Sequence, residues 1–448
     1  MVAAQFMFVV DAFIVNVAIP AIRIDIGATS GEIAAIVAIY QIAYASIVVT
    51  GGRLGDIFGA RRLFLIGLSG FIASSLWCGL SQSGAELIVA RLVQGASAAL
   101  MVPQVLGTIH ALFADEKERS RAFGIFGVAL GLGGAVGFAL GGALVSVNLS
   151  GLGWRMIFFV NIPVGLAIMI AASRLMPRFA SDASARVDWA GAGLLFVGLV
   201  ALLGPIMFGR EAGWPSWVWA VLAVGALDLA LFLAVQRARA WHRGPTLIDV
   251  RLLADSAFCF GALATFCFFA GNVSFYFVMT LYMQNGLGIG ALEAGLAFVP
   301  LAAAFTLASR GATARVARHG VRALMQGCTV ALAGLALTGV ALAANVSAPL
   351  VLAILLGVFG FGQGLVMAPL FATVLSMLPR TQASAGAGML ATVQQAGNAT
   401  GVALVGALYF ALADAHPHRD ALLASLAAIG TTLVASIAGL AVLRLRGR

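Results

Sequence analysis

Asp11 is a carboxylate in an apolar segment, residues 1–22, where water is scarce. It lies about 10 residues, or roughly 15 Å, into a helix, which is near the middle of a bilayer. A carboxylate at that depth is costly and is usually functional. Because burial disfavours the charged form, we expect Asp11 to bind and release a proton. The alternative is a structural aspartate that bonds to Asn16 or to a neighbouring helix.

Arg91 is a second ionisable residue among apolar side chains, in segment 85–112. Arg91 and Gln94 share one face of a helix, and Gly95 joins that face. An arginine in this setting must find a partner or extend to the membrane surface. We expect Arg91 to adjust proton binding by Asp11, and the alternative is that it reaches the outer surface of the membrane.

Asp228 is a third ionisable residue, deep in segment 215–236. It is a possible second titrating carboxylate, but a structural role between segments 188–209 and 215–236 is favoured. The four cysteines fall in apolar runs, and no His, Cys or carboxylate cluster has the spacing of a metal site. No phosphate-binding loop is found either. We therefore expect no metal, no cofactor and no enzymatic activity.

The composition of the chain indicates a membrane protein. Of its 448 residues, 62% are hydrophobic and 10% are charged, whereas a soluble domain carries roughly 25% charged residues. The apolar runs are long enough to span a bilayer, where the backbone satisfies its own hydrogen bonds as helix. The net charge of +9 comes without a dense basic run, so we expect lipid and not nucleic acid as a partner.

The sequence predicts an all-α integral membrane protein with fourteen spanning helices. Their predicted ranges are 1–22, 32–52, 62–82, 85–112, 122–147, 155–176, 188–209, 215–236, 257–284, 291–309, 321–344, 347–378, 384–413 and 421–443. No segment between them is long enough to be a soluble domain. This argues against a membrane protein that senses without transporting, since such a protein would carry a large extramembrane domain.

Lysine and arginine residues are concentrated in one set of alternating loops. Outside that set, the loops contain only Arg23, Arg155, Arg210 and Arg419. Cytoplasmic loops carry the excess of basic residues in membrane proteins. The pattern therefore predicts a multi-pass protein of the cytoplasmic membrane with both termini in the cytoplasm.

Short matching patterns indicate an internal repeat. Residues 59–61 and 320–322 follow the second and tenth helices, and Gln94 and Gln363, each followed by glycine, lie in the fourth and twelfth. These matches predict two parallel six-helix bundles with the seventh and eighth helices inserted between them. The predicted parts are residues 1–176, 177–250 and 251–448.

A parallel repeat puts a small-molecule site near the midplane, between its halves. We regard Asn16, Gln94 and Gln363 as candidates to line that cavity. An exporter of anions should present several basic residues there. Arg91 is the one basic residue found in the interior of a predicted helix, which weakly favours neutral or cationic lipophilic substrates.

Residues 52–62 combine glycines with charged residues at the end of the second helix. Gly52 and Gly59 permit a tight turn and close helix approach, and Asp56 is able to accept hydrogen bonds from Arg61 or Arg62. Positive loop charge alone would explain the arginines but not the spacing of the glycines and the aspartate.

The fifth helix carries a second glycine pattern. Gly133, Gly137, Gly141 and Gly142 form a smooth stripe on which another helix can pack closely.

These patterns, together with residues 11–20 and 154–163, resemble the fourteen-helix drug:proton antiporters of the major facilitator superfamily. The resemblance covers nearly the whole chain. It implies a proton-coupled antiporter, of multidrug efflux type, that exports hydrophobic or amphipathic and often cationic compounds, with residues 52–62 as a cytoplasmic gate motif. We expect a monomer. Residues 154–163 read as an interfacial anchor and helix start, without a chemical role.

The chain departs from the family pattern at three positions. Ile57 and Ala60 stand where the family has basic residues, and Phe138 stands where it has a proline. The first two changes predict a weaker gate contact, and the third removes a predicted kink. The open alternatives for function are export of one metabolite, lipid or organic acid, and a non-transporting sensor.

Reporter fusions test the predicted topology. We expect fusions after residues 211, 286 and 345 to report an outside location, and fusions after residues 181, 245 and 380 to report an inside location. A consistent inversion beyond residue 210 would show that the seventh and eighth helices are not an inserted pair.

Overall fold

The computed structural model describes residues 1–112, 115–148, 151–177, 186–242, 244, 246–346, 348–379 and 382–446. The predicted loop positions 181, 245 and 380 lie outside these ranges. The described residues form helices with short connections and contain no strand. Thirteen helical segments in this part of the chain are long and apolar enough to cross a bilayer, and α5 adds a shorter apolar stretch, Leu132–Val147. The predicted all-α membrane fold is confirmed.

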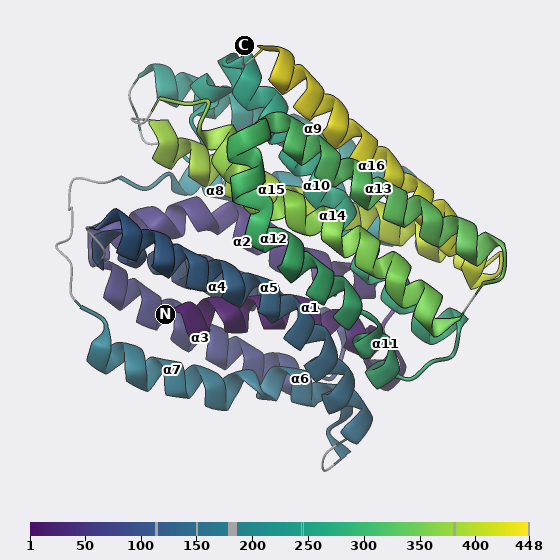
Figure 1. The fold of residues 1–448 in the computed structure, drawn as a ribbon. Coiled ribbons are helices and arrows are strands. Elements are labelled where there is room, and N and C mark those ends of the chain that lie inside the picture. The colour runs from purple at the N-terminus through teal and green to yellow at the C-terminus, as the bar shows by residue number, and fades with distance from the viewer. Residues whose placement is uncertain are drawn as a thin grey trace. The chain divides into compact units, whose positions relative to one another are not determined.

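The first of two compact units comprises Met1–Ile248 (Figure 1). Its helices are α1 (Val2–Ile26), α2 (Ser30–Phe58), α3 (Ala60–Leu80), α4 (Gly84–Leu112), α5 (Glu116–Val147), η2 (Gly153–Arg155), α6 (Met156–Phe159), α7 (Asn161–Leu175), α8 (Trp189–Phe208) and α9 (Ser216–Trp241). The hairpin of α8 and α9 belongs to this unit, and α8 packs against α2. The predicted three-part division at residues 176 and 250 stays a prediction.

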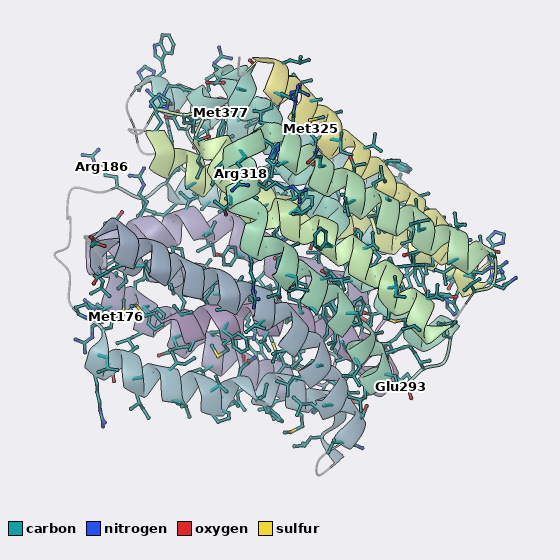
Figure 2. All side chains as sticks on the ribbon, in the orientation of Figure 1. Met176, Arg186, Glu293, Arg318, Met325 and Met377 are labelled. Atoms are coloured by element: carbon teal, nitrogen blue, oxygen red, sulfur yellow. The ribbon has the colours of Figure 1, made fainter. Side chains whose placement is uncertain are left out.

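The second unit comprises Asp249–Arg448. Its helices are η3 (Val250–Ala254), α10 (Ser256–Leu281), η4 (Tyr282–Gly286), α11 (Ala291–Ala297), α12 (Val299–His319), α13 (Val321–Ala343), α14 (Pro349–Leu375), α15 (Ala383–Ala413) and α16 (His418–Arg446). Figure 2 shows Glu293 and Arg318 at opposite ends of the span made by α11 and α12.

The two units use the same helix pairs. In the first unit α1 packs on α5, and α4 packs on both α2 and α3. In the second unit α10 packs on α15, and α14 packs on both α12 and α13. Equivalent glycines make the approach possible, because Gly95 of α4 lies against the carbonyl of Tyr40, and Gly364 of α14 lies against that of Phe305. The sequence matches around Gln94 and Gln363 therefore correspond to equivalent helix contacts.

Two predicted helices, 155–176 and 291–309, are each interrupted. The first breaks at Val160, between α6 and α7, and the second breaks at Phe298, between α11 and α12. Pro163 and Pro300 follow these breaks. Proline has no N–H for the carbonyl four residues earlier, so the helical ladder is broken there. Each pair of short helices still forms one apolar span.

The predicted turn at residues 52–59 is much shorter than expected. The helix α2 continues to Phe58, so Gly52 is helical, and Gly59 alone adopts a left-handed φ of 89°. The predicted role in the turn was therefore wrong for Gly52, which lies within α2. The close helix approach predicted for Gly52 stays a prediction. Gln104 of α4 donates to the carbonyl of Gly51 at 2.8 Å and holds this end of α2 against α4.

Asp188 joins both ends of the α8–α9 hairpin to the chain that follows. It caps α8 through the N–H of Gly191, and it accepts from Gln236 at 2.6 Å and from Arg239. The N–H of Leu247 also donates to it, at 3.1 Å. Burial raises the pKa of Asp188, but the bonds from Gln236, Gly191 and Arg239 outweigh this effect and leave the pKa below its ordinary value.

Candidate functional site

The helix α1 is held very close to α5 on both sides of Asp11. A Cβ atom added to Gly137 would lie 3.0 Å from the carbonyl oxygen of Val10, and one added to Gly141 would lie 2.9 Å from that of Ile14. Any larger residue would push the helices apart, because backbone cannot move aside as a side chain can. The glycine stripe therefore fixes the position of the helix that carries Asp11.

The rest of the glycine motif extends this contact. Gly133 lies against Val9 of α1, and Gly142 is buried. Phe138, which stands in the place of the family's proline, packs against Phe13 with ring centroids 5.3 Å apart. The position of the family's proline is thus used here for an aromatic contact between α1 and α5.

The helices α2 and α4 bring an aromatic ring to Arg91. Since Gly95 has no side chain, α4 approaches the backbone of Tyr40 on α2. The guanidinium carbon of Arg91 lies 4.1 Å from the centre of the Tyr40 ring and 5.9 Å from that of Phe158. Such cation–π contacts stabilise a cation most strongly where water is excluded.

Asp11 lies at the centre of a buried polar cluster, which we call the Asp11 cluster. Its members are Asp11, Ser75, Arg91, Gln94 and Asn161, from α1, α3, α4 and α7. Arg91 Nη1 donates to Asp11 Oδ2 at 2.7 Å. Asp11 Oδ1 accepts from Gln94 Nε2 at 3.0 Å and from Asn161 Nδ2 at 2.7 Å.

The remaining bonds of the cluster connect its members to one another. Arg91 Nη1 also donates to Gln94 Oε1 at 2.6 Å. Ser75 Oγ accepts from Gln94 Nε2 at 2.7 Å and from Asn161 Nδ2 at 3.3 Å. Each helix that contributes to the cluster is therefore linked to Asp11 directly or through one amide.

The cluster satisfies both oxygens of Asp11. Both carboxylate oxygens accept hydrogen bonds, and the nearby cation is Arg91. Asp11 is fully buried and Arg91 is 1% exposed. A buried charge pair of this kind is held by mutual neutralisation and by its hydrogen bonds.

The geometry bears on two alternatives from the sequence. Asn16 donates to the carbonyls of Ala12 and Phe13 in its own helix, so it does not satisfy Asp11. Neighbouring helices do bond to Asp11, as the structural alternative allowed. Arg91 is buried against Asp11, so it does not extend to the outer surface. Asn16 lies after Asp11 in α1, is buried, and is not a member of the Asp11 cluster.

Sequence reasoning missed Asn161. It lies in the stretch 154–163, to which we gave an anchoring role only, and it reaches the carboxylate directly. The available signal was Pro163, which breaks the helix just before Asn161 and starts α7 there. The anchor itself is present, since Trp154 and Arg155 both donate to Asp25 near the end of α1.

Other candidate residues lie outside the Asp11 cluster. Asp228 lies on α9, and its Oδ2 is buried beside Gly198 of α8 with no hydrogen-bond partner among the described residues. In the second unit, Tyr276 donates to Gln363 Oε1 at 2.8 Å. In the gate motif, Arg61 donates to the carbonyl of Ser173 near the end of α7.

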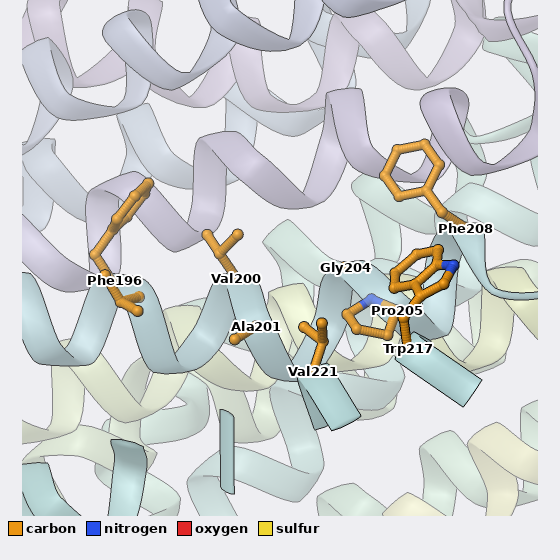
Figure 3. A pocket seen from close by; sticks show the side chains of 9 residues that line it. Phe196, Val200, Ala201, Gly204, Pro205, Phe208, Trp217 and Val221 are labelled. Atoms are coloured by element: carbon orange, nitrogen blue, oxygen red, sulfur yellow. The ribbon is translucent and has the colours of Figure 1, made fainter. Parts of the chain in front are cut away.

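An apolar groove of about 530 Å³ lies on the α8–α9 hairpin (Figure 3). Its lining residues are Phe196, Val197, Val200, Ala201, Gly204, Pro205, Phe208, Trp217 and Val221. None of these side chains ionises, and none belongs to the Asp11 cluster. We assign the groove no chemical role.

Known proteins resemble the chain along most of its length. The model of the family described as Major Facilitator Superfamily matches residues 1–402. A "Probable actinorhodin transporter" of Streptomyces coelicolor is 35% identical over 91% of this chain and 71% of the relative. A cephamycin export protein of Amycolatopsis lactamdurans is 35% identical over 90% of this chain and 82% of the relative.

More distant similarities concern the fold alone. A solved D-xylose-proton symporter has a TM-score of 0.68 and 14% identity, and the match covers 97% of this chain and 94% of that one. A solved peptide transporter has a TM-score of 0.70 and 17% identity, covering 100% of this chain and 93% of that one.

Removal of one member of the buried charge pair should cost more than removal of both. Arg91→Met leaves the carboxylate of Asp11 without its cation, and we expect a loss of about 3–5 kcal/mol in unfolding free energy. The double variant Asp11→Asn, Arg91→Met should recover most of that loss. Thermal unfolding of the purified proteins measures both. Arg251→Met is the control, because Arg251 is exposed in its pair with Asp249 and should contribute only about 0–1 kcal/mol.

The result that contradicts the pair is simple additivity. Asp11→Asn is also measured alone. If the loss in the double variant equals the sum of the losses in Arg91→Met and Asp11→Asn, Asp11 and Arg91 do not neutralise each other in the folded protein.

Proposed function

Because this chain belongs to the major facilitator superfamily, we propose that it exports organic compounds across the cytoplasmic membrane in exchange for protons. The observation that carries the proposal is the Asp11 cluster, a carboxylate buried against an arginine inside a membrane-spanning bundle. Such groups are rare in membrane helices and usually serve ion or substrate pathways. The relatives are transporters, and we propose no enzymatic activity.

The proposed substrates are hydrophobic or amphipathic compounds, often cationic. Support comes from the relatives, which include a puromycin resistance protein of Streptomyces alboniger and a multidrug resistance protein of Mycobacterium tuberculosis, 32% and 30% identical to this chain. The predicted interior also holds few basic residues, and such an interior would not attract an anion. The chain therefore fits a drug efflux transporter.

Proton exchange follows from competition for Asp11. In the contact seen here, Arg91 and the two amides all donate to the carboxylate, and we propose this contact as the state that follows proton release. If α1 and α4 separate in another state, Asp11 is a buried carboxylate without a cation, which favours proton uptake. A cationic substrate near Asp11 would displace that proton by the same electrostatics. Return of Arg91 would then reset the site.

The other motifs have supporting roles in this proposal. The glycine stripe of α5 fixes α1, and the gate motif contributes a cytoplasmic latch through Gly52, Asp56, Gly59, Arg61 and Arg62. Asn16, Gln94 and Gln363 are proposed to face the substrate cavity, and Asp228 remains a possible second carboxylate. We propose a monomer with both termini in the cytoplasm, in keeping with the distribution of basic loops.

A second candidate function is export of one specific metabolite. Two relatives bear the names of single compounds, actinorhodin and cephamycin, and not of drug classes. The breadth of substrates separates the two functions. A drug-efflux protein should protect a pump-deleted host against several unrelated compounds, whereas a dedicated exporter should protect it against one compound or none.

The transport test uses a pump-deleted host and a fluorescent cationic drug. The protein should keep cellular drug low, and an uncoupler that collapses the proton gradient should abolish that effect. Asp11→Asn should lose uphill export at normal expression, because its amide cannot carry a proton. Asp228→Asn tests the possible second carboxylate, and it should keep uphill export if Asp11 alone carries the proton. Full export by Asp11→Asn at the wild-type rate would refute Asp11 as the carrier.

A further inference from the structure

Asn161 is the first residue of α7 and is only 2% exposed. Its Nδ2 donates to Asp11 Oδ1 at 2.7 Å and to Ser75 Oγ at 3.3 Å. Both of these bonds are donated by Nδ2, and Oδ1 is the acceptor of the same carboxamide. Asn161 therefore carries an acceptor as well as a donor beside the carboxylate that is proposed to take up a proton.

Protonation of Asp11 creates a problem for the cluster as it stands. The carboxylate now accepts from Arg91, Gln94 and Asn161, so every neighbour that bonds to it is a donor. A protonated Asp11 becomes a donor itself and needs an acceptor. A buried donor without an acceptor is costly, and the cost would oppose proton uptake.

Gln94 is poorly suited to supply that acceptor. Its Oε1 already accepts from Arg91 Nη1 at 2.6 Å, and the thiol of Cys78 lies 3.7 Å away as a second donor. If the amide turned over, its NH₂ group would face the N–H groups of Arg91, and two donors would oppose each other. Gln94 is therefore fixed with its oxygen toward Arg91.

Asn161 is free of that restriction. The oxygen and nitrogen of an amide are of similar size, so half a turn changes the hydrogen bonding and preserves the packing. After the turn, Oδ1 would face Asp11 and accept a hydrogen bond from the O–H of the protonated carboxyl group. Ser75 can follow the change, because a hydroxyl that accepts from Nδ2 can instead donate to Oδ1.

We propose that Asn161 is a positioning residue whose carboxamide turns with the protonation of Asp11, donating to the carboxylate and accepting from the acid. This inference rests on the proposed proton coupling and deepens it. Asn161 thereby lowers the cost of the protonated state without contacting the substrate. Its place directly after the break at Val160 starts α7 at the level of Asp11.

Few other groups near Asp11 could titrate or carry charge. Arg91 comes from α4, Tyr40 from α2 and Cys78 from α3, and Arg91 is the cation that pairs with Asp11. The described faces that α5 and α6 turn toward α1 present glycine and apolar side chains, including Gly137 and Phe158. A change in hydrogen bonding at Asp11 can therefore be traced to few neighbouring groups.

Infrared difference spectra of the full-length purified protein, taken between neutral and acidic pH, test the proposal. The C=O stretch of a protonated carboxyl reports whether its O–H finds an acceptor. We expect a band that disappears in Asp11→Asn, which assigns it to Asp11. In Asn161→Leu, which has nearly the same size, the Asp11 band should shift to higher wavenumber, because the acid has lost its acceptor.

Asn16→Leu is the matched control, since Asn16 is also a buried asparagine but bonds only to its own helix. It should leave the frequency of the Asp11 band unchanged. If Asn161→Leu does not fold, Asn161→Ala is tested in the same way. Asn161→Asp should make the band appear at higher pH, because two adjacent carboxyl groups resist joint ionisation.

The outcomes separate this inference from the proposed function. An Asp11 band that is present but unmoved in Asn161→Leu or Asn161→Ala overturns the role of Asn161 alone. An unchanged titration in Asn161→Asp overturns it as well. If no band depends on Asp11 at any pH at which the protein is folded, then Asp11 does not take up the proton, and the coupling proposal fails first.

Discussion

A carboxylate and a guanidinium buried together inside a membrane-spanning bundle place the main constraint on the first unit. Neither charge is stable there alone, so Asp11 and Arg91 must meet, and α1 and α4 must be positioned to let them meet. The amides of Gln94 and Asn161 fill the remaining acceptor sites of the carboxylate. In the proposed mechanism the same dependence lets the pair act as a switch, because separation of the helices would change which protonation state is stable.

Small residues satisfy that constraint. Gly137 and Gly141 of α5 let α1 approach on both sides of Asp11, and Gly95 of α4 admits the backbone of Tyr40, whose ring supports Arg91. In the second unit, Gly397 and Gly401 of α15 lie against the carbonyls of Phe266 and Ala270 in the same manner. The two units thus share a packing scheme, and the Asp11–Arg91 pair distinguishes the first.

The sequence predicted the fold and the ionisable centre for clear physical reasons. Long apolar runs identify spanning helices, and Asp11 and Arg91 are conspicuous because each is costly in its run. Asn161 was missed because an asparagine near an interfacial tryptophan reads as part of a helix start. The turn predicted at Gly52 was wrong because a glycine that permits a turn and one that lies within a helix are identical in sequence. Three-dimensional packing decides both cases.

Proton release on substrate binding tests the central claim most directly. In weakly buffered solution, a transported cationic drug is added to the purified protein over a series of pH values, and the change in bulk pH is recorded. The account predicts that the wild-type protein releases protons as the drug binds, and that Asp11→Asn binds the drug without release. Equal proton release by wild type and a drug-binding Asp11→Asn would contradict the account.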